Sequence, residues 1–112
     1  MPQEAFVFKI KADFLKALAH PVRLKILEHL RTREASVGEL VRKLEVEQSS
    51  LSKHLGILKQ VGILQSRREK VTIYYSVRDR EVFSVLRPVI LILKRKLAES
   101  RGILDHLGKT GR

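Results

Sequence analysis

The stretch QSSLSKHLGILKQVG, residues 48–62, decides the fold. Its leucines Leu51, Leu55 and Leu58 recur at intervals of four and three, so they form one apolar stripe on a helix. The opposite face is small and polar, with one lysine and a mid-helix glycine that costs about 1 kcal/mol relative to alanine. Small hydroxyls, an amide and a lysine suit the base edges and phosphates of a DNA major groove, but an ordinary amphipathic helix would show the same pattern. The neighbouring segments therefore decide between these two interpretations.

A second short helix is expected immediately before this one. Ser36 followed by Glu39 is a capping-box pattern, and it opens a segment whose apolar side chains share one helical face. Only three residues separate that segment from Gln48. Two short helices joined by such a turn are typical of a helix-turn-helix, here residues 36–61, in which the second helix enters the DNA groove. The apolar face of the first helix consists of Val37, Leu40, Val41 and Leu44.

Two further helices are expected before residue 36. Residues 5–10 alternate in a way that fits either a short strand or a helix start, and the pattern becomes helical from Lys11. His20-Pro21 interrupts the pattern, because proline disfavours a helical residue before it and fits the first turn of a new helix. The new helix is expected to run to about Arg31 and to bury Val22, Ile26, Leu27 and Leu30.

The segment after Gly62 has the two-residue period of strands. Gly62 is expected to end the long helix, and residues 63–68 and 71–77 then indicate a two-stranded hairpin. A basic hairpin directly after a recognition helix is typical of a wing, here residues 63–77, that lies along phosphates or enters the minor groove. A solvated, charge-rich turn is the alternative. The basic residues of the turn are Arg67, Arg68 and Lys70.

Asp79 is expected to cap a last helix that reaches about Leu107 and is kinked or split at Pro88. Its apolar side chains follow a heptad seam that favours pairing between two subunits, with packing onto the chain's own core as the alternative. The tail, residues 108–112, is expected to be disordered. The seam consists of Leu86, Ile90, Leu93, Leu97, Ser100, Leu104 and Leu107, and Val82, Val85 and Val89 form a second apolar face that could serve the core.

The composition indicates a polyanionic partner. The 112 residues include 23 Lys and Arg against 12 Asp and Glu, a net charge of +11 that is spread along the chain. A chain of this length has room for one domain with a modest core. The absence of cysteine excludes disulfides and thiolate metal sites. We expect a cytoplasmic protein without membrane contact, because no signal peptide is visible and the longest apolar run, residues 89–93, cannot span a bilayer.

Three strings in this order resemble the ArsR/SmtB family of small winged-helix repressors. They are LAHPVRLKIL at residues 18–27, QSSLSKHL at residues 48–55, and RRE followed by IYY within residues 67–75. The resemblance extends over residues 14–85. It implies one winged helix-turn-helix domain spanning residues 1–112, mainly α-helical with a two-stranded β-hairpin. It also implies a homodimer that releases operator DNA when an inducer binds, although the sequence names no inducer.

The resemblance further implies which residues face DNA. We expect the two terminal helices, residues 6–19 and 79–107, to form the dimer interface. The DNA-facing residues are Gln48, Ser49, Ser52, Lys53 and His54 on the recognition helix, with His54 at the border of the apolar face, and Arg67, Arg68 and Lys70 in the wing. The expected interface residues are Phe6, Phe14, Leu86, Ile90, Leu93 and Leu97.

The two metal sites known in the family are not expected here. Where metal-sensing members carry Cys-Val-Cys, residues 36–38 read Ser-Val-Gly. Where other members place ligands on the last helix, this chain has Asp79, Glu81, Ile92 and Arg95, and neither hydrocarbon nor guanidinium is a metal ligand. The four histidines are not spaced as ligand pairs, so we expect no metal and no other cofactor.

The sequence therefore favours a dimeric, sequence-specific DNA-binding transcriptional regulator, a repressor, whose partner is double-stranded operator DNA. The alternative is a winged-helix module that binds a protein and makes only non-specific nucleic-acid contact. The exposed face of residues 48–60 favours DNA, because protein-binding faces usually carry aromatic or large aliphatic anchors. An enzyme has the least support, because no glycine-rich phosphate loop, paired carboxylates or activated nucleophile is present.

Overall fold

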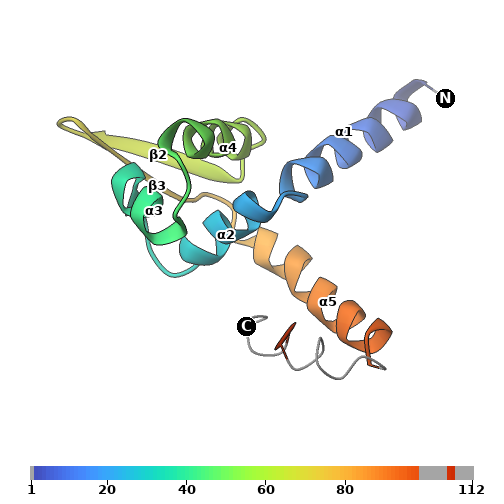
Figure 1. Ribbon diagram of the computed structural model, residues 1–112. Coiled ribbons are helices and arrows are strands. Elements are labelled where there is room, and N and C mark those ends of the chain that lie inside the picture. The colour runs from blue at the N-terminus through green and yellow to red at the C-terminus, as the bar shows by residue number, and fades with distance from the viewer. Residues whose placement is uncertain (1, 99–105, 108–112) are drawn as a thin grey trace. The chain divides into compact units, whose positions relative to one another are not determined.

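The computed structural model describes residues 2–98 and 106–107 of the chain. The chain forms two compact units, one up to Asp79 and one from Arg80. The first unit contains helices α1 to α4 and a small sheet, and the second contains helix α5 (Figure 1). The elements in chain order are α1 (Pro2–Leu18), α2 (Pro21–His29), β1 (Ala35–Ser36), α3 (Val37–Leu44), α4 (Gln48–Gln60), β2 (Leu64–Glu69), β3 (Thr72–Val77) and α5 (Glu81–Lys96). This order confirms the predicted winged helix-turn-helix fold.

The core of the first unit forms around one face of α4. Leu51, Leu55 and Leu58 are 0% exposed, as the apolar stripe in the sequence predicts. Helices α2 and α3 and strand β2 all pack against α4. Full burial of one such leucine stabilises the fold by about 1.5–3 kcal/mol, so this face supplies a large share of the core energy. The other fully buried side chains are Ile26, Leu27, Leu30, Leu40, Ile63 and Leu64.

Local capping contacts start α2 and α3 where the sequence predicts. The His20 Nδ1 atom accepts a hydrogen bond from the Val22 amide at 3.1 Å, so His20 is the N-cap of the helix that begins at Pro21. The Ser36 hydroxyl oxygen accepts from the Glu39 amide at 3.1 Å and caps α3. The second half of the expected capping box is different, because the Glu39 carboxylate contacts side chains of the preceding segment instead.

The hairpin pairs Leu64 with Val77 and Glu69 with Thr72, which confirms the predicted antiparallel strands. The sheet has a third strand, which the sequence pattern does not predict. Ala35 and Ser36 pair with β3, so the sheet has the order β1-β3-β2. A strand of two residues carries no alternation that a sequence pattern could reveal.

Helix α1 begins at Pro2, so the strand interpretation of residues 5–10 is wrong. It extends away from the rest of the first unit (Figure 1), and residues 3–13 are exposed. Phe6 and Phe8 are 63% and 64% exposed, whereas Ala17 and Leu18 at the other end are buried. Only the C-terminal end of α1 therefore takes part in the core of this unit.

Helix α5 differs from its prediction at both ends. Arg80 is the N-cap residue, so Asp79 lies one position too early to be the cap. The helix continues through Pro88 without splitting and ends at Lys96, well before Leu107. Of the predicted seam, Leu86, Ile90, Leu93 and Leu97 are half-buried, whereas Ser100, Leu104 and the tail at 108–112 lie outside the described residues. On the second apolar face, Val82 is buried while Val85 and Val89 are each 45% exposed.

The end of α4 requires a left-handed residue, and Gly62 provides it with φ +87°. Its amide donates to the Lys59 carbonyl, and the Ile63 amide donates to the Leu58 carbonyl, each at 3.0 Å. This pair of hydrogen bonds is the Schellman motif that ends many helices. Glycine is favoured here by its backbone conformation alone, because an added Cβ would have no neighbour within 4 Å.

We expect Gly62→Ala to lower the free energy of unfolding by about 1–2 kcal/mol, because the left-handed backbone conformation at this position is less favourable for alanine than for glycine. Urea denaturation at a fixed protein concentration measures this change.

Gly56→Ala is the matched control, because Gly56 is in mid-helix and also has open space around its Cβ position. We expect it to raise the free energy of unfolding by about 1 kcal/mol. Shifts of the same sign in both variants would contradict the assignment of Gly62 as the helix terminator.

Candidate nucleic-acid interface

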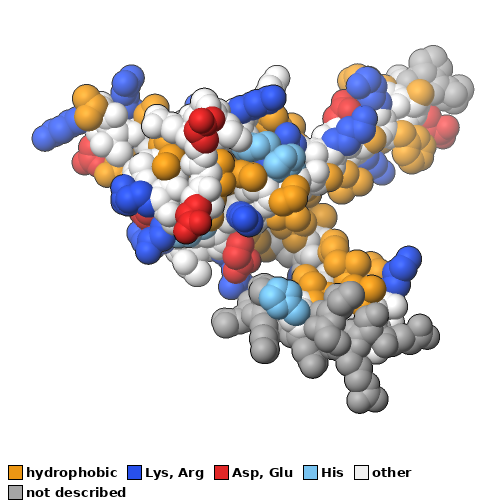
Figure 2. Space-filling view, viewed as in Figure 1, with side chains coloured by type: hydrophobic (Ala, Val, Ile, Leu, Met, Phe, Trp, Pro, Cys, Tyr) orange, Lys and Arg blue, Asp and Glu red, His pale blue; other side chains and the backbone are white. Residues whose placement is uncertain are grey.

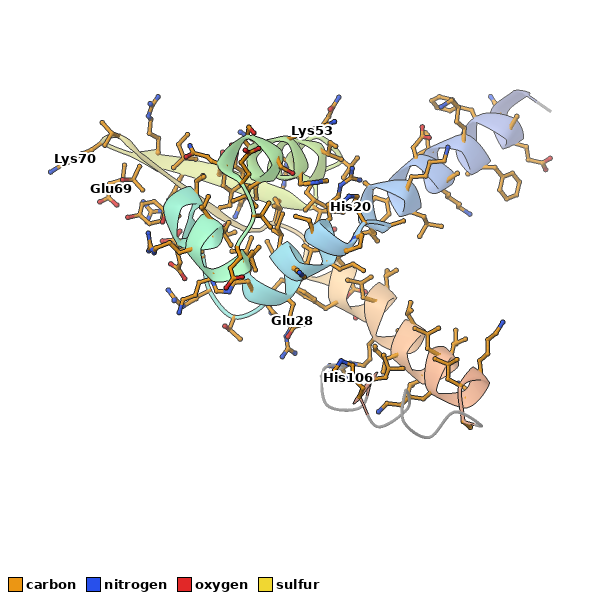
Figure 3. All side chains as sticks on the ribbon, in the orientation of Figure 1. His20, Glu28, Lys53, Glu69, Lys70 and His106 are labelled. Atoms are coloured by element: carbon orange, nitrogen blue, oxygen red, sulfur yellow. The ribbon has the colours of Figure 1, made fainter. Side chains whose placement is uncertain are left out.

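The outer face of α4 carries the polar side chains that the sequence analysis assigned to DNA. Gln48, Ser49, Ser52 and Lys53 are all exposed. Figure 3 shows Lys53 pointing outward from α4. The Ser49 hydroxyl donates to the Glu47 carboxylate at 2.8 Å, so it must exchange this partner before it can donate to a nucleic acid.

His54 does not share that face, which corrects its expected position. Its side chain is only 7% exposed and lies between α4 and the α1–α2 junction. The Arg23 Nε atom donates to His54 Nδ1 at 3.1 Å, and the ring centroids of His20 and His54 are 4.2 Å apart. Burial, followed by the neighbouring His20, Arg23 and Lys53, lowers the pKa of His54. In this arrangement His54 is an internal contact.

Arg23 is a residue whose role the sequence analysis missed. Its guanidinium also donates to the backbone carbonyls of Lys16 and Ala17, at 3.3 and 3.1 Å. The signal available in the sequence was an arginine three residues after the helix-capping His20. Nothing in that local pattern names His54, 31 positions away, as its partner.

The two faces of β2 have different surroundings. Leu64 is buried, and the Ser66 hydroxyl accepts from Lys59 Nζ of α4 at 2.8 Å, so this face is turned toward α4. Side chains alternate along a strand, which places Arg68 on the same face as Ser66. Arg67 belongs to the opposite face, together with Gln65, which contacts Ser76 on the neighbouring strand.

Arg67 is held by carboxylates on that opposite face. Its Nε and Nη2 atoms donate to the two carboxylate oxygens of Glu34 at 3.0 and 2.6 Å, and Nη1 donates to Glu69 at 3.3 Å. The guanidinium also lies 4.5 Å from the centre of the Tyr74 ring. The hydrogen bonds from Arg67 lower the pKa of Glu34, and the same hydrogen bonds to Glu34 raise the pKa of Arg67. These contacts separate Arg67 from Arg68 and Lys70, with which the sequence analysis had grouped it.

Lys70 occupies the tip of the hairpin, where Figures 2 and 3 show a basic side chain extending beyond α3 and α4. It is the first residue of a two-residue turn and has φ +59°. Hairpins favour glycine, asparagine or aspartate where φ is positive, and this turn has none of these. The second turn residue, Val71, is 89% exposed. The wing therefore presents one cation and one small apolar side chain at its tip.

The polar side chains at the start of α3 are engaged in local contacts. Ser36 caps α3, and the Glu39 carboxylate contacts His29 at 3.0 Å and Arg33 at 3.0 Å. The hydrogen bond from His29 is the largest cause of the lowered pKa of Glu39. Within residues 2–98 and 106–107, no three His, Asp or Glu side chains gather as a metal site would require. None of the helices in this part of the chain is long and apolar enough to cross a membrane.

Comparison with known proteins identifies the family to which a chain with this fold is similar. A helix-turn-helix domain family matches residues 18–67. The HTH-type transcriptional regulator Rv0081 of Mycobacterium tuberculosis is 37% identical over 94% of this chain and 93% of its own length. The transcriptional repressor SmtB homologue of Synechocystis is 35% identical over 70% of this chain and 59% of its own length.

Solved structures agree with the sequence matches. The crystal structure of Rv0081 covers 84% of this chain and 95% of its own with a TM-score of 0.75 and 38% identity. The homodimeric winged helix-turn-helix DNA-binding domain of Mb0332 from Mycobacterium bovis, a possible ArsR-family regulator, covers 88% of this chain and 92% of its own. Its TM-score is 0.75 and its identity 26%. This chain belongs to the ArsR/SmtB family.

As a member of the ArsR/SmtB family, the protein is a winged helix-turn-helix transcriptional regulator that binds DNA. The family places α4 as the recognition helix and the β2–β3 hairpin as the wing. The two faces of the wing differ, because one face carries Arg68 and meets α4 through Ser66, whereas on the other the Arg67 guanidinium is paired with Glu34 and Glu69.

We expect zinc, nickel or arsenite at modest excess to leave the DNA affinity of this ArsR/SmtB member unchanged. The reason is that residues 36–38 and the positions Asp79, Glu81, Ile92 and Arg95 lack the ligand sets of the two family sites. Fluorescence anisotropy with labelled DNA measures the affinity. Stoichiometric, tight metal binding in calorimetry with a matching loss of DNA binding would contradict this expectation.

Proposed function

We propose that this protein is a homodimeric repressor that recognises a specific double-stranded operator in the cytoplasm. The observation that carries the proposal is the shared orientation of two basic elements. The small polar face of α4 is exposed, and the face of β2 that carries Arg68 is the one that meets α4 through the Lys59–Ser66 hydrogen bond. One DNA duplex can therefore contact both elements at once.

The two elements are suited to different parts of DNA. Gln48, Ser49 and Ser52 are short hydrogen-bonding side chains on the first turns of α4, and such groups discriminate base edges in the major groove. Within the described residues, Lys53, Arg68 and Lys70 are exposed cations without the fixed carboxylate partners that hold Arg67, and cations of this kind contact phosphates. We therefore assign recognition of the base sequence to α4 and binding of the DNA backbone to the wing.

The proposed dimer uses the terminal helices. Phe6 and Phe8 on α1 are large aromatic side chains that are mostly exposed in the single chain, and such surface is costly unless a partner covers it. Mb0332 is a homodimer by its own description. On α5, an exposed stripe lies beside the predicted seam. The interface residues we propose are Phe6, Phe14, Leu86, Ile90, Leu93 and Leu97, with Val85, Val89 and Ile92 at their edge.

Repression is proposed to follow from occupancy of the operator by the dimer. A dimer places two recognition helices on consecutive turns of one face of the duplex, so the operator should consist of two related half-sites. The name of the Synechocystis relative describes a repressor, and we propose that this protein also represses transcription. Sequencing the genomic fragments bound by the purified protein tests the proposal. A recurring two-half-site sequence is expected, whereas fragments without a shared sequence would favour a protein-interaction module.

We expect Phe6→Glu and Leu93→Glu each to produce a monomer that has lost most of its DNA binding, because each places an uncompensated charge in the proposed interface. Sedimentation velocity measures the oligomeric state. Ser84→Glu is the control, because this exposed residue lies on the same helix as Leu93 but outside the seam. If Leu93→Glu still forms a dimer, α5 does not pair through this seam.

We expect Arg68→Ala to weaken binding to all DNA and to flatten its salt dependence. Each lost phosphate contact lowers the slope of log K against log salt by about 0.9, or by about 1.8 for the two copies in a dimer. Arg67→Ala is the matched control on the adjacent residue. It should leave this slope nearly unchanged, because its charge is paired with Glu34 and Glu69. Titrations at several salt concentrations measure both slopes.

The same titrations separate the reading residues from the wing. Gln48→Ala or Ser52→Ala should relax sequence preference by about 1–3 kcal/mol per lost base contact, with little change for random DNA. A wing variant with an unchanged salt slope but an altered sequence preference would reverse these roles.

A further inference from the structure

The side chains of His20, Arg23 and His54 meet where α1, α2 and α4 join. Arg23 donates from Nη1 to the carbonyls of Lys16 and Ala17 in the last turn of α1, and from Nε to His54 in the middle of α4. One guanidinium therefore ties the end of the first helix to the recognition helix. Figure 3 shows His20 at this junction, beside the end of α1.

The direction of the hydrogen bond from Arg23 determines the protonation state of the His54 ring. Arginine can only donate, so His54 Nδ1 must carry a lone pair and the ring proton lies on Nε2. His20 Nδ1 likewise accepts from the Val22 amide. The His54 imidazole is therefore neutral in this arrangement, and its ring centroid lies 4.2 Å from that of His20.

In the described part of the chain, no acidic group acts on His54 to stabilise a second ring proton. The groups that act on it are His20 from the α1–α2 junction, Arg23 from α2 and Lys53 from its own helix, and all three are basic. Helix α1 contributes backbone carbonyls, which Arg23 already occupies. In the described part of the chain, no carboxylate of α3, β2 or any other element acts on this ring.

A proton on His54 Nδ1 would have two consequences. It would replace the acceptor of the Arg23 hydrogen bond with a donor, and it would add a positive charge next to a guanidinium. Burial of that charge is unfavourable as well. The tie between α1 and α4 then cannot persist in its present form.

We propose that Arg23 and neutral His54 form the positioning contact that orients the recognition helix relative to α1, and that protonation of His54 releases operator DNA at mildly acidic pH. The inference rests on the proposed function. There, α1 joins the two subunits and α4 reads the operator, so the contact sets the spacing of the two recognition helices. Arg23 and His54 act through α4 and touch no DNA themselves.

The inference predicts that operator binding weakens as the pH falls, which is opposite to the general effect of net charge. Because the folded arrangement lowers the pKa of His54 below its ordinary value of about 6.5, the stabilisation is complete above that pH. It is lost as the pH falls through the lowered value. General electrostatics acts in the opposite direction, because protonated histidines add positive charge and strengthen binding to any DNA. Weaker operator binding in acid therefore cannot come from net charge.

The experiment compares operator and random DNA from about pH 7.5 to about pH 5.5 at constant ionic strength. For the wild-type protein we expect operator affinity to fall by about tenfold or more, while affinity for random DNA is unchanged or rises. His54→Gln offers an amide oxygen to Arg23 and does not titrate, so it should bind the operator at neutral pH and lose the acid response. His29→Gln is the matched control on another histidine and should keep the response.

Two results would overturn the inference while leaving the proposed function intact. One is operator binding by the wild-type protein that does not weaken in acid, and the other is an unchanged acid response in His54→Gln. Absence of operator binding at every pH would instead overturn the proposed function.

If His54→Gln fails to fold, NMR titration of the wild-type protein takes its place. We expect the His54 ring to titrate below its ordinary pKa of about 6.5, with a simultaneous shift of the Arg23 Nε–H signal. Titration of His54 at or above its ordinary pH without that shift would overturn the inference.

Discussion

The structure depends on the burial of one face of a single helix. Leu51, Leu55 and Leu58 have no exposed surface, and α2, α3 and β2 all pack against the helix that carries them. Because these elements occupy one side of α4, its other side is left to solvent along its whole length. The packing that creates the core therefore also presents the recognition surface, and a change that loosens one would displace the other.

Signals that act within a few residues were sufficient to predict most of the fold. His20-Pro21 marks a helix boundary, Ser36 begins α3 and Gly62 ends α4, each through a backbone or capping preference that needs no distant partner. The leucine spacing of α4 correctly predicted its buried face. On the candidate site, the same periodicity correctly places Gln48 and Lys53 at the surface, since exposure follows directly from the helical pattern.

The remaining features depend on partners far away in the sequence. His54 lies at the border of the apolar stripe, and Arg23, its hydrogen-bond partner, lies 31 positions earlier. Arg67 and Arg68 look equivalent in a basic run, but the pleat of the strand sends Arg67 toward Glu34, 33 positions away. The two-residue strand β1 exists only because β3 is there to pair with it. Neither composition nor periodicity contains such pairings, so sequence reasoning grouped residues that the structure separates.

Ser36 has a double role with a consequence for how tightly DNA can be held. Its backbone pairs with Tyr74 of the wing, and its hydroxyl caps the first helix of the helix-turn-helix. One residue thus joins the wing to α3 without a flexible linker between them. In the proposed complex, once α4 has entered a groove, the wing meets the DNA backbone at a high effective concentration and little further entropy is lost. On the proposed function, the two elements would therefore bind as a single preorganised bidentate ligand, and complete dissociation would require both contacts to be broken at the same time.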